Sequence, residues 1–309
     1  MDRLLKALVG RVATPRAARA LEAWCFVFLG LIVVGVVAGG LLLFGRVNSA
    51  AVLIGIEAAA IILGASLMAL LSRLAELFGQ HARDIDAQAL LAALRRGEGR
   101  PPFTLYLRPF ASTGEIDEEE LAPLLVGGRT PGLGMISARY ELEHQIERAT
   151  RKVGPLVALG LPLEHIGAGR IAVDETNWKE AVELLTRAAA LIIMLPSSRA
   201  GTQWEISHIL DGDMMQRTVI IDPPNMPPRP GRRFNQAAEW GRVREVFAQH
   251  GYDMPADSKI GRMLFFGAGR APEATTRLDI EAEGGIARFF RTVIRAQGAK
   301  TQHNMGTTP

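Results

Sequence analysis

Two long apolar stretches near the start of the chain place the strongest limit on its fold. Residues 24–44 contain no charged side chain, and residues 51–72 contain only Glu57. A helix needs about 20 predominantly apolar residues to cross the hydrocarbon core of a bilayer, and both stretches reach that length. The segment between them, 45–50, is too short for a domain. We therefore predict a transmembrane hairpin of two helices over residues 23–72.

Two alternatives explain these stretches less well. A cleaved signal peptide has an apolar region of about 7–15 residues and a small-residue cleavage site, whereas the first stretch is longer and a second follows directly. Helices that are apolar all round can also form the core of a soluble protein, but such helices rarely run this far without a charge. The membrane hairpin therefore remains the preferred interpretation.

Basic residues predict the orientation of the hairpin. The turn carries Arg46 alone, whereas both flanks are rich in Lys and Arg: Arg3, Lys6, Arg11, Arg16 and Arg19 before the first stretch, and Arg73, Arg83, Arg95 and Arg96 after the second. Short flanks of this kind stay in the cytoplasm. We therefore expect an inner (cytoplasmic) membrane protein that contacts the lipid bilayer through two spans. Its basic N-terminal segment, 1–22, and its long C-terminal part are then both cytoplasmic.

Small residues in the predicted spans indicate close helix packing. Gly35 and Gly39 are four positions apart, a spacing that lets two helices approach closely. The approach takes place either within the hairpin or between two copies in a homo-oligomer, and the C-terminal domain is a second route to self-association. Glu57 lies near the exported end of its span, where water solvates it, so we expect no polar pathway there.

The composition argues against several classes of function. The net charge is only +3, and no block rich in Lys and Arg is interleaved with aromatic residues, so we expect no nucleic-acid binding. Cys25 is the single cysteine, which leaves no disulfide framework and no cysteine-based metal site. His144, His165 and His208 lack the spacing of metal ligands. We therefore expect no metal and no resident cofactor.

Predicted strands and helices alternate in the cytoplasmic part. We expect a helical stalk over 73–100, one α/β domain over 101–298 and a disordered tail over 299–309. The predicted strands are 103–108, 155–160, 170–174, 190–195, 217–222 and 262–266, and the predicted helices are 139–153, 176–188, 202–210, 237–250 and 284–297. This alternation implies right-handed βαβ units and a doubly wound, mostly parallel sheet.

The carboxyl edge of such a sheet is where a ligand is expected. Ligands of doubly wound sheets bind beyond the carboxyl ends of the strands, which points to segments 108–110, 161–169 and 196–205. The third segment follows the most apolar strand and leads into a helix. Its Ser197, Ser198 and backbone amides suit a phosphate or a ribose. Neither GxxxxGK[ST] nor a GxGxxG after a strand is present.

Two short motifs resemble known families. LRPF at 107–110 and GTQWEI at 201–206, with the element order over roughly 103–297, resemble the TIR-like Rossmannoid domains of bacterial membrane proteins. GTQWEI and the strand after it are also similar to nucleoside 2-deoxyribosyltransferase-like proteins. The resemblance implies a flavodoxin-like or TIR-like sheet and a role in signalling or defence.

The resemblance also implies a chemistry. In both families a carboxylate at this position serves the cleavage of an N-glycosidic bond, so Glu205 becomes the candidate catalytic residue and NAD or another nucleotide the candidate substrate. The implied substrate-binding residues are Arg108, Phe110, Ser197, Ser198, Thr202 and Trp204. In the TIR pattern a Trp precedes the Glu by four positions, whereas Trp204 and Glu205 are adjacent. The adjacent pair suits the deoxyribosyltransferase-like alternative better.

A purely structural role for Glu205 is the alternative. Thr202-x-x-Glu205 matches a capping box, in which the Thr caps a helix and the Glu bonds back to the Thr amide. We expect such a cap to stabilise the start of the helix by about 1 kcal/mol. The domain would then be a non-catalytic module that senses a nucleotide, self-associates at the membrane or docks partners.

Overall fold

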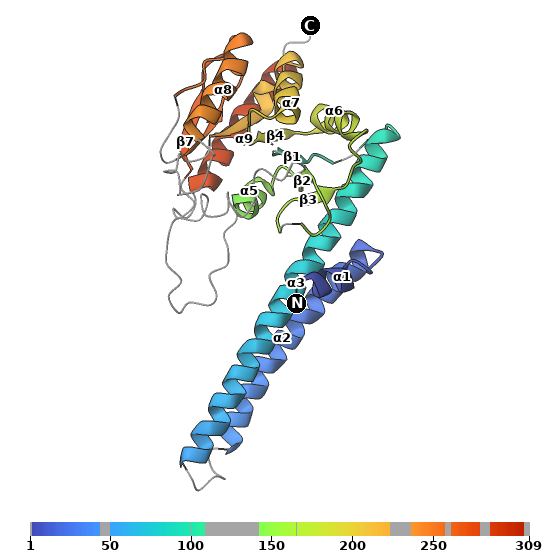
Figure 1. Ribbon diagram of the computed structural model, residues 1–309, viewed down its shortest axis with the longest axis vertical. Helices are drawn as coiled ribbons and strands as arrows, with labels where there is room; N and C mark the ends of the chain where they lie inside the picture. The colour runs from blue at the N-terminus through green and yellow to red at the C-terminus, as the bar shows by residue number, and fades with distance from the viewer. Residues whose placement is uncertain are drawn as a thin grey trace. The chain divides into compact units, whose positions relative to one another are not determined.

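The computed structural model divides the chain into two compact units (Figure 1). The first unit comprises Met1–Asp86 and Pro162–Gly169, and the second comprises Ala87–Leu161 and Arg170–Pro309. The structure describes residues 2–43, 50–99, 101–108, 142–164, 166–222, 236–256, 261–278 and 285–305.

The first unit is built from three helices. These are α1 (Asp2–Val9), α2 (Pro15–Leu43) and most of α3 (Ala50–Arg95). Figure 1 shows α2 and α3 running side by side. At one crossing point, Cγ2 of Val36 lies only 3.2 Å from the position that a Cβ on Gly64 would take. The absence of a side chain at Gly64 therefore lets the two helices pack closely.

Two of these helices are long and apolar enough to cross a membrane. The stretches Pro15–Val36 and Ala58–Arg95 each contain an 18-residue window with a mean hydropathy of 1.9. Only 6% and 11% of the best windows are buried inside the chain, whereas a core helix of a soluble protein is mostly buried. Large apolar side chains are instead exposed along both helices, as at Trp24 and Leu63. The predicted turn, with Arg46, lies outside the described residues, as does the side chain of Glu57.

The three helices also form a small apolar cluster. Val9 of α1, Cys25 of α2 and Phe78 of α3 are buried together, and Leu163 of the second chain segment of this unit joins them. Cys25 therefore packs as a small apolar residue in this cluster, and the cluster ties segment Pro162–Gly169 to the helices.

The second unit contains a seven-stranded sheet in the order β3-β2-β1-β4-β5-β6-β7. The strands are β1 (Thr104–Leu107), β2 (Leu156–Leu159), β3 (Gly169–Ile171), β4 (Leu191–Met194), β5 (Thr218–Asp222), β6 (Arg262–Phe265) and β7 (Ala274–Arg277). Strand β1 is parallel to β2 and β4, and β4 is parallel to β5. Strands β6 and β7 are antiparallel to their neighbours. The predicted α/β class and mostly parallel sheet are therefore confirmed.

The central strands are buried on both faces. Every residue of β1 and β4 is buried, as their continuous apolar sequences predict for strands of a parallel sheet. On one face, Leu105 and Ile192 share a core with residues of α6 (Trp178–Ala188), α7 (Ala200–Asp211) and α8 (Gln236–Gln249). Successive strand residues point to opposite faces, so Tyr106 and Ile193 are buried on the other face.

The remaining helices, α5 (Leu142–Thr150) and α9 (Gly285–Met305), pack against each other. Helix α9 continues past its predicted end at residue 297. Strand β7 was not predicted, because its sequence, Ala-Thr-Thr-Arg, is partly or fully exposed and has no apolar alternation. It is a strand because it pairs with β6, with Phe265 opposite Ala274 and Arg262 opposite Arg277.

Candidate functional site

The strand order reverses between β1 and β4. From β1 the chain crosses to β2 on one side of the sheet, and it later returns to β4 on the other side. Ligands of open α/β sheets bind at this reversal, beyond the carboxyl ends of the strands. The described residues at that edge are Arg108 after β1, residues 195–199 after β4 and the first turns of α7. Phe110 lies outside the described residues.

Glu205 places a carboxyl group in the interior of the second unit. It lies in the second turn of α7, directly after the strand at the reversal, and only 2% of it is exposed. No hydrogen bond reaches its Oε2 atom from the described part of the chain. Burial disfavours the charged form and raises the pKa of Glu205 to about 8. The side chain is therefore mostly protonated at pH 7.

The capping-box prediction for Glu205 is wrong. Helix α7 begins at Ala200, and Arg199 occupies the N-cap position without a side-chain capping hydrogen bond. The helix starts two residues earlier than the sequence indicated, so Thr202 lies within its first turn and Glu205 lies beyond it. Capping groups serve the free amides of the first turn. Glu205 therefore has no capping role, and it shares a buried face of α7 with Thr202.

Ser198 is held by α8 rather than left open for a ligand. Its hydroxyl donates to Oε2 of Glu239 over 2.7 Å, and its amide donates to Oε1 of the same carboxylate. Arg242 donates to the Ser198 hydroxyl over 3.0 Å and to Glu239 over 2.7 Å. Burial opposes ionisation of Glu239, but hydrogen bonds from Ser198 and Arg242 outweigh it and lower the pKa of Glu239. Ser197 is buried beside this network.

A second ion pair occupies the same edge at β5. Asp222, the last residue of β5, is 1% exposed and accepts a hydrogen bond from Nε of Arg262 over 2.9 Å. The antiparallel register places these two residues opposite each other. The local sequence does not reveal this pair, because the register of β6 against β5 cannot be read from it.

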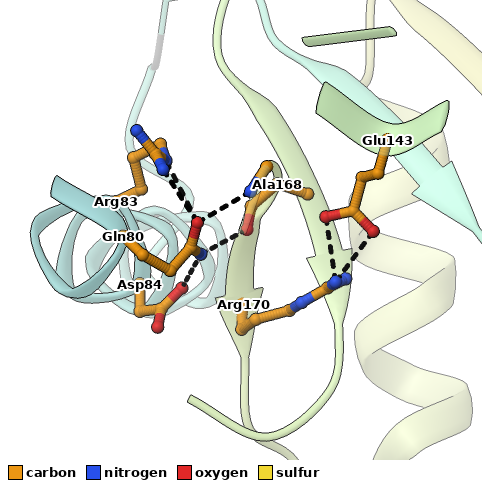
Figure 2. A network of polar contacts seen from close by, with 7 residues as sticks. Gln80, Arg83, Asp84, Glu143, Ala168 and Arg170 are labelled. Atoms are coloured by element: carbon orange, nitrogen blue, oxygen red, sulfur yellow. Dashed lines mark hydrogen bonds and ion pairs between the residues drawn. The ribbon is translucent and has the colours of Figure 1, made fainter. Parts of the chain in front are cut away.

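Segment 161–169, expected to approach a ligand, is bound by the chain itself (Figure 2). Gln80 of α3 donates to the carbonyl of Ala168 over 2.7 Å and accepts from the amide of Gly167 over 2.9 Å. Asp84 accepts from the amide of Leu163 over 2.8 Å. These backbone groups are therefore already paired within the first unit.

Trp204 lies in a different environment from its neighbour Glu205. Its ring stacks on His208 with centroids 5.3 Å apart, and it meets Trp178 edge-on at 5.0 Å. The ammonium of Lys179 lies 5.2 Å from its centroid. Trp204 lines a cleft between α6 and α7, and Glu205 does not. The structure thus separates the two residues that the sequence motif placed together.

Comparison with known proteins gives no relative for this chain. No protein-family model, curated protein or solved structure matches it. The resemblance carried by residues 107–110 and 201–206 therefore stays a prediction. Within the residues described, no group of three or more His, Cys, Asp or Glu side chains is arranged to hold a metal ion. The functional argument then rests on the geometry around Glu205.

Proposed function

We propose that this protein is a membrane-anchored α/β domain that binds NAD or a related nucleotide and cleaves its N-glycosidic bond through Glu205. One observation carries the proposal: the helix after the strand at the reversal point buries a carboxyl group whose Oε2 atom has no hydrogen-bond partner among the described residues. Strongly perturbed carboxyls at such a position are candidates for function, because a structural carboxyl would have its partners. The order β3-β2-β1-β4-β5 also reverses between β1 and β4, as in doubly wound sheets that bind nucleotides.

The environment of Glu205 suits a reaction in which positive charge develops. When the bond between C1′ of the ribose and nicotinamide breaks, its electron pair leaves with the neutral base and the sugar becomes oxocarbenium-like. A cation beside Glu205 would favour its ionised form, and that carboxylate would stabilise the sugar. Water then adds to C1′ and releases a proton, and the products are nicotinamide and ADP-ribose.

The experiment uses the full chain in lipid nanodiscs. Nicotinamide release from NAD is followed by chromatography, with base release from deoxynucleosides measured in parallel. We expect Glu205→Gln to lower turnover at least about 100-fold, the usual range for an acid–base or nucleophilic carboxyl. Glu180→Gln is the control, because Glu180 forms an exposed ion pair with Arg95. Folded wild-type protein that releases no base from either substrate class contradicts the proposal.

A non-catalytic, self-associating module is the second candidate. A Cβ added to Gly35 or Gly39 would meet nothing within 4 Å among the described residues. Among the described residues neither glycine has a close contact from α3, so this side of α2 is the one that a second copy would approach. Nucleotide binding without turnover, together with crosslinked dimers in the membrane, would favour this function over cleavage.

A further inference from the structure

Helices α6 and α7 border a cleft of about 630 Å³ that the proposed function does not use. It is lined by Glu183 and Arg187 of α6, Trp204, His208 and Asp211 of α7, and Arg217. Arg217 directly precedes β5, which is parallel to β4. The cleft therefore reaches the amino edge of the sheet, whereas the candidate site around Glu205 belongs to the carboxyl edge. Its volume is within the range of about 300–1,000 Å³ that is usual for small-molecule sites.

Two acidic and two basic side chains line the cleft, and of these four Arg217 alone has no salt-bridge or histidine contact among the described residues. Glu183 and Arg187 form an ion pair with N and O atoms 3.5 Å apart, and Asp211 lies 3.3 Å from Nε2 of His250. Arg217 has no acidic partner within the described ranges, and its Nη1 donates to the carbonyl of Ala189 over 3.1 Å. Burial lowers the pKa of Arg217, because the charged guanidinium is partly removed from water. A bound anion would offset this desolvation cost.

The aromatic side of the cleft is formed by two rings that stack on each other. The planes of Trp204 and His208 differ by only 3°. The Thr186 hydroxyl donates to the carbonyl of Val182 over 2.7 Å, so it accepts a hydrogen bond from Nε2 of His208 at 3.1 Å. This arrangement leaves Nδ1 of His208 as an acceptor. Burial lowers the pKa of His208, which keeps the ring neutral at pH 7.

We propose that this cleft is a second binding site, for a small molecule that carries an anionic group and a planar ring. Arg217 binds the anionic group, a phosphate or a carboxylate. The ring packs against the part of the Trp204–His208 pair that lines the cleft. The site is independent of Glu205, because no part of that side chain lines the cleft.

The test is calorimetric titration of the full chain in nanodiscs with AMP, benzoate, adenosine and inorganic phosphate. AMP and benzoate supply the two kinds of anion, each joined to a ring. Adenosine and phosphate supply only the ring and only the anion. We expect at least one of AMP and benzoate to bind tenfold or more tightly than either partial probe. Phosphate that binds as tightly as AMP, or no saturable binding by AMP and benzoate, overturns the proposal.

Amino-acid substitutions test whether the probes bind in this cleft. Arg217→Gln should weaken binding at least tenfold, and Arg244→Gln should leave it unchanged, because Arg244 also donates to a backbone carbonyl, that of Met254, but lies outside the cleft. Ser207→Trp fills the cleft from its lining and should abolish binding if Arg217→Gln does not fold. Glu205→Gln should bind like the wild type. Binding that Glu205→Gln removes, or that Ser207→Trp retains, contradicts the second site.

Discussion

At the scale of single residues, Glu205 contributes a free energy that opposes folding. Its pKa is about 8 in the folded chain, against an ordinary value of 4.5. Between these values the folded state holds a proton that the unfolded state releases, so stability falls as pH rises through this range. At about 1.4 kcal/mol per unit, the cost at pH 7 is about 3 kcal/mol.

Replacing this carboxyl by an amide should therefore stabilise the protein. We expect Glu205→Gln to raise the free energy of unfolding at pH 7 by up to about 3 kcal/mol, with little difference at pH 4.5. Denaturant unfolding of both proteins at several pH values checks this. Glu180→Gln, at an exposed ion pair, is the control. A difference that does not grow with pH would mean that Glu205 is ionised in the folded state.

Gly154 is a residue whose lack of a side chain is required. Its φ is +151°, and a Cβ there would overlap the carbonyl oxygen of Pro102 and lie 2.7 Å from the carbonyl carbon. We expect Gly154→Ala to cost more than about 2 kcal/mol, because a backbone atom must move. Gly241→Ala, in α8 with open space around it, should instead stabilise by about 0.5–1 kcal/mol. Thermal unfolding of the two variants provides the comparison, and similar midpoints would contradict it.

At the scale of elements, the contact between α3 and segment Pro162–Gly169 is a clear target. Asp84→Ala leaves the buried amide of Leu163 unpaired, which costs about 1–3 kcal/mol. Leu163 also has a φ of +60°, an unfavourable value for this residue. We expect at least about fivefold faster hydrogen exchange at the Leu163 amide, the equivalent of 1 kcal/mol.

Asp86→Ala is the matched control for that measurement. Asp86 lies half a turn further along α3 and pairs with Arg19 at an exposed site, so its loss should cost less than about 1 kcal/mol. Unchanged exchange at Leu163 in Asp84→Ala would show that the apolar cluster alone holds the segment.

Local sequence patterns predicted most strands of the sheet but few of the contacts in the candidate site. The apolar run at 190–195 indicated β4, because a strand that is buried on both faces is apolar at nearly every position. Strand β7 has no such sequence pattern, because it is a strand only through its pairing with β6. Likewise, Glu239 binds Ser198 from 41 residues away, and α3 binds segment 161–169 from 79 to 88 residues away. Contacts of this kind depend on the assembled fold, which a periodicity does not encode.

At the scale of the whole molecule, α2 and α3 expose long apolar surfaces, and we propose that the lipid bilayer covers these surfaces. In a Cys25→Ser background, Asn48→Cys tests the turn and Gln302→Cys tests the C-terminal region. An impermeant maleimide should label the cysteine at 48 from outside spheroplasts, and that at 302 only after lysis, because the basic flanks stay inside. Labelling at 302 in intact spheroplasts would overturn this orientation.

The protonated state of Glu205 has one further consequence, which concerns the proton itself. With a pKa of about 8, the free protein holds about 0.9 proton on this carboxyl at pH 7. A cationic ligand that stabilises the carboxylate must expel it to the buffer, so affinity should rise up to tenfold per pH unit until about pH 8. Calorimetry in buffers of different ionisation enthalpy would count the proton released, and this count reports on the carboxyl even when no bond is broken.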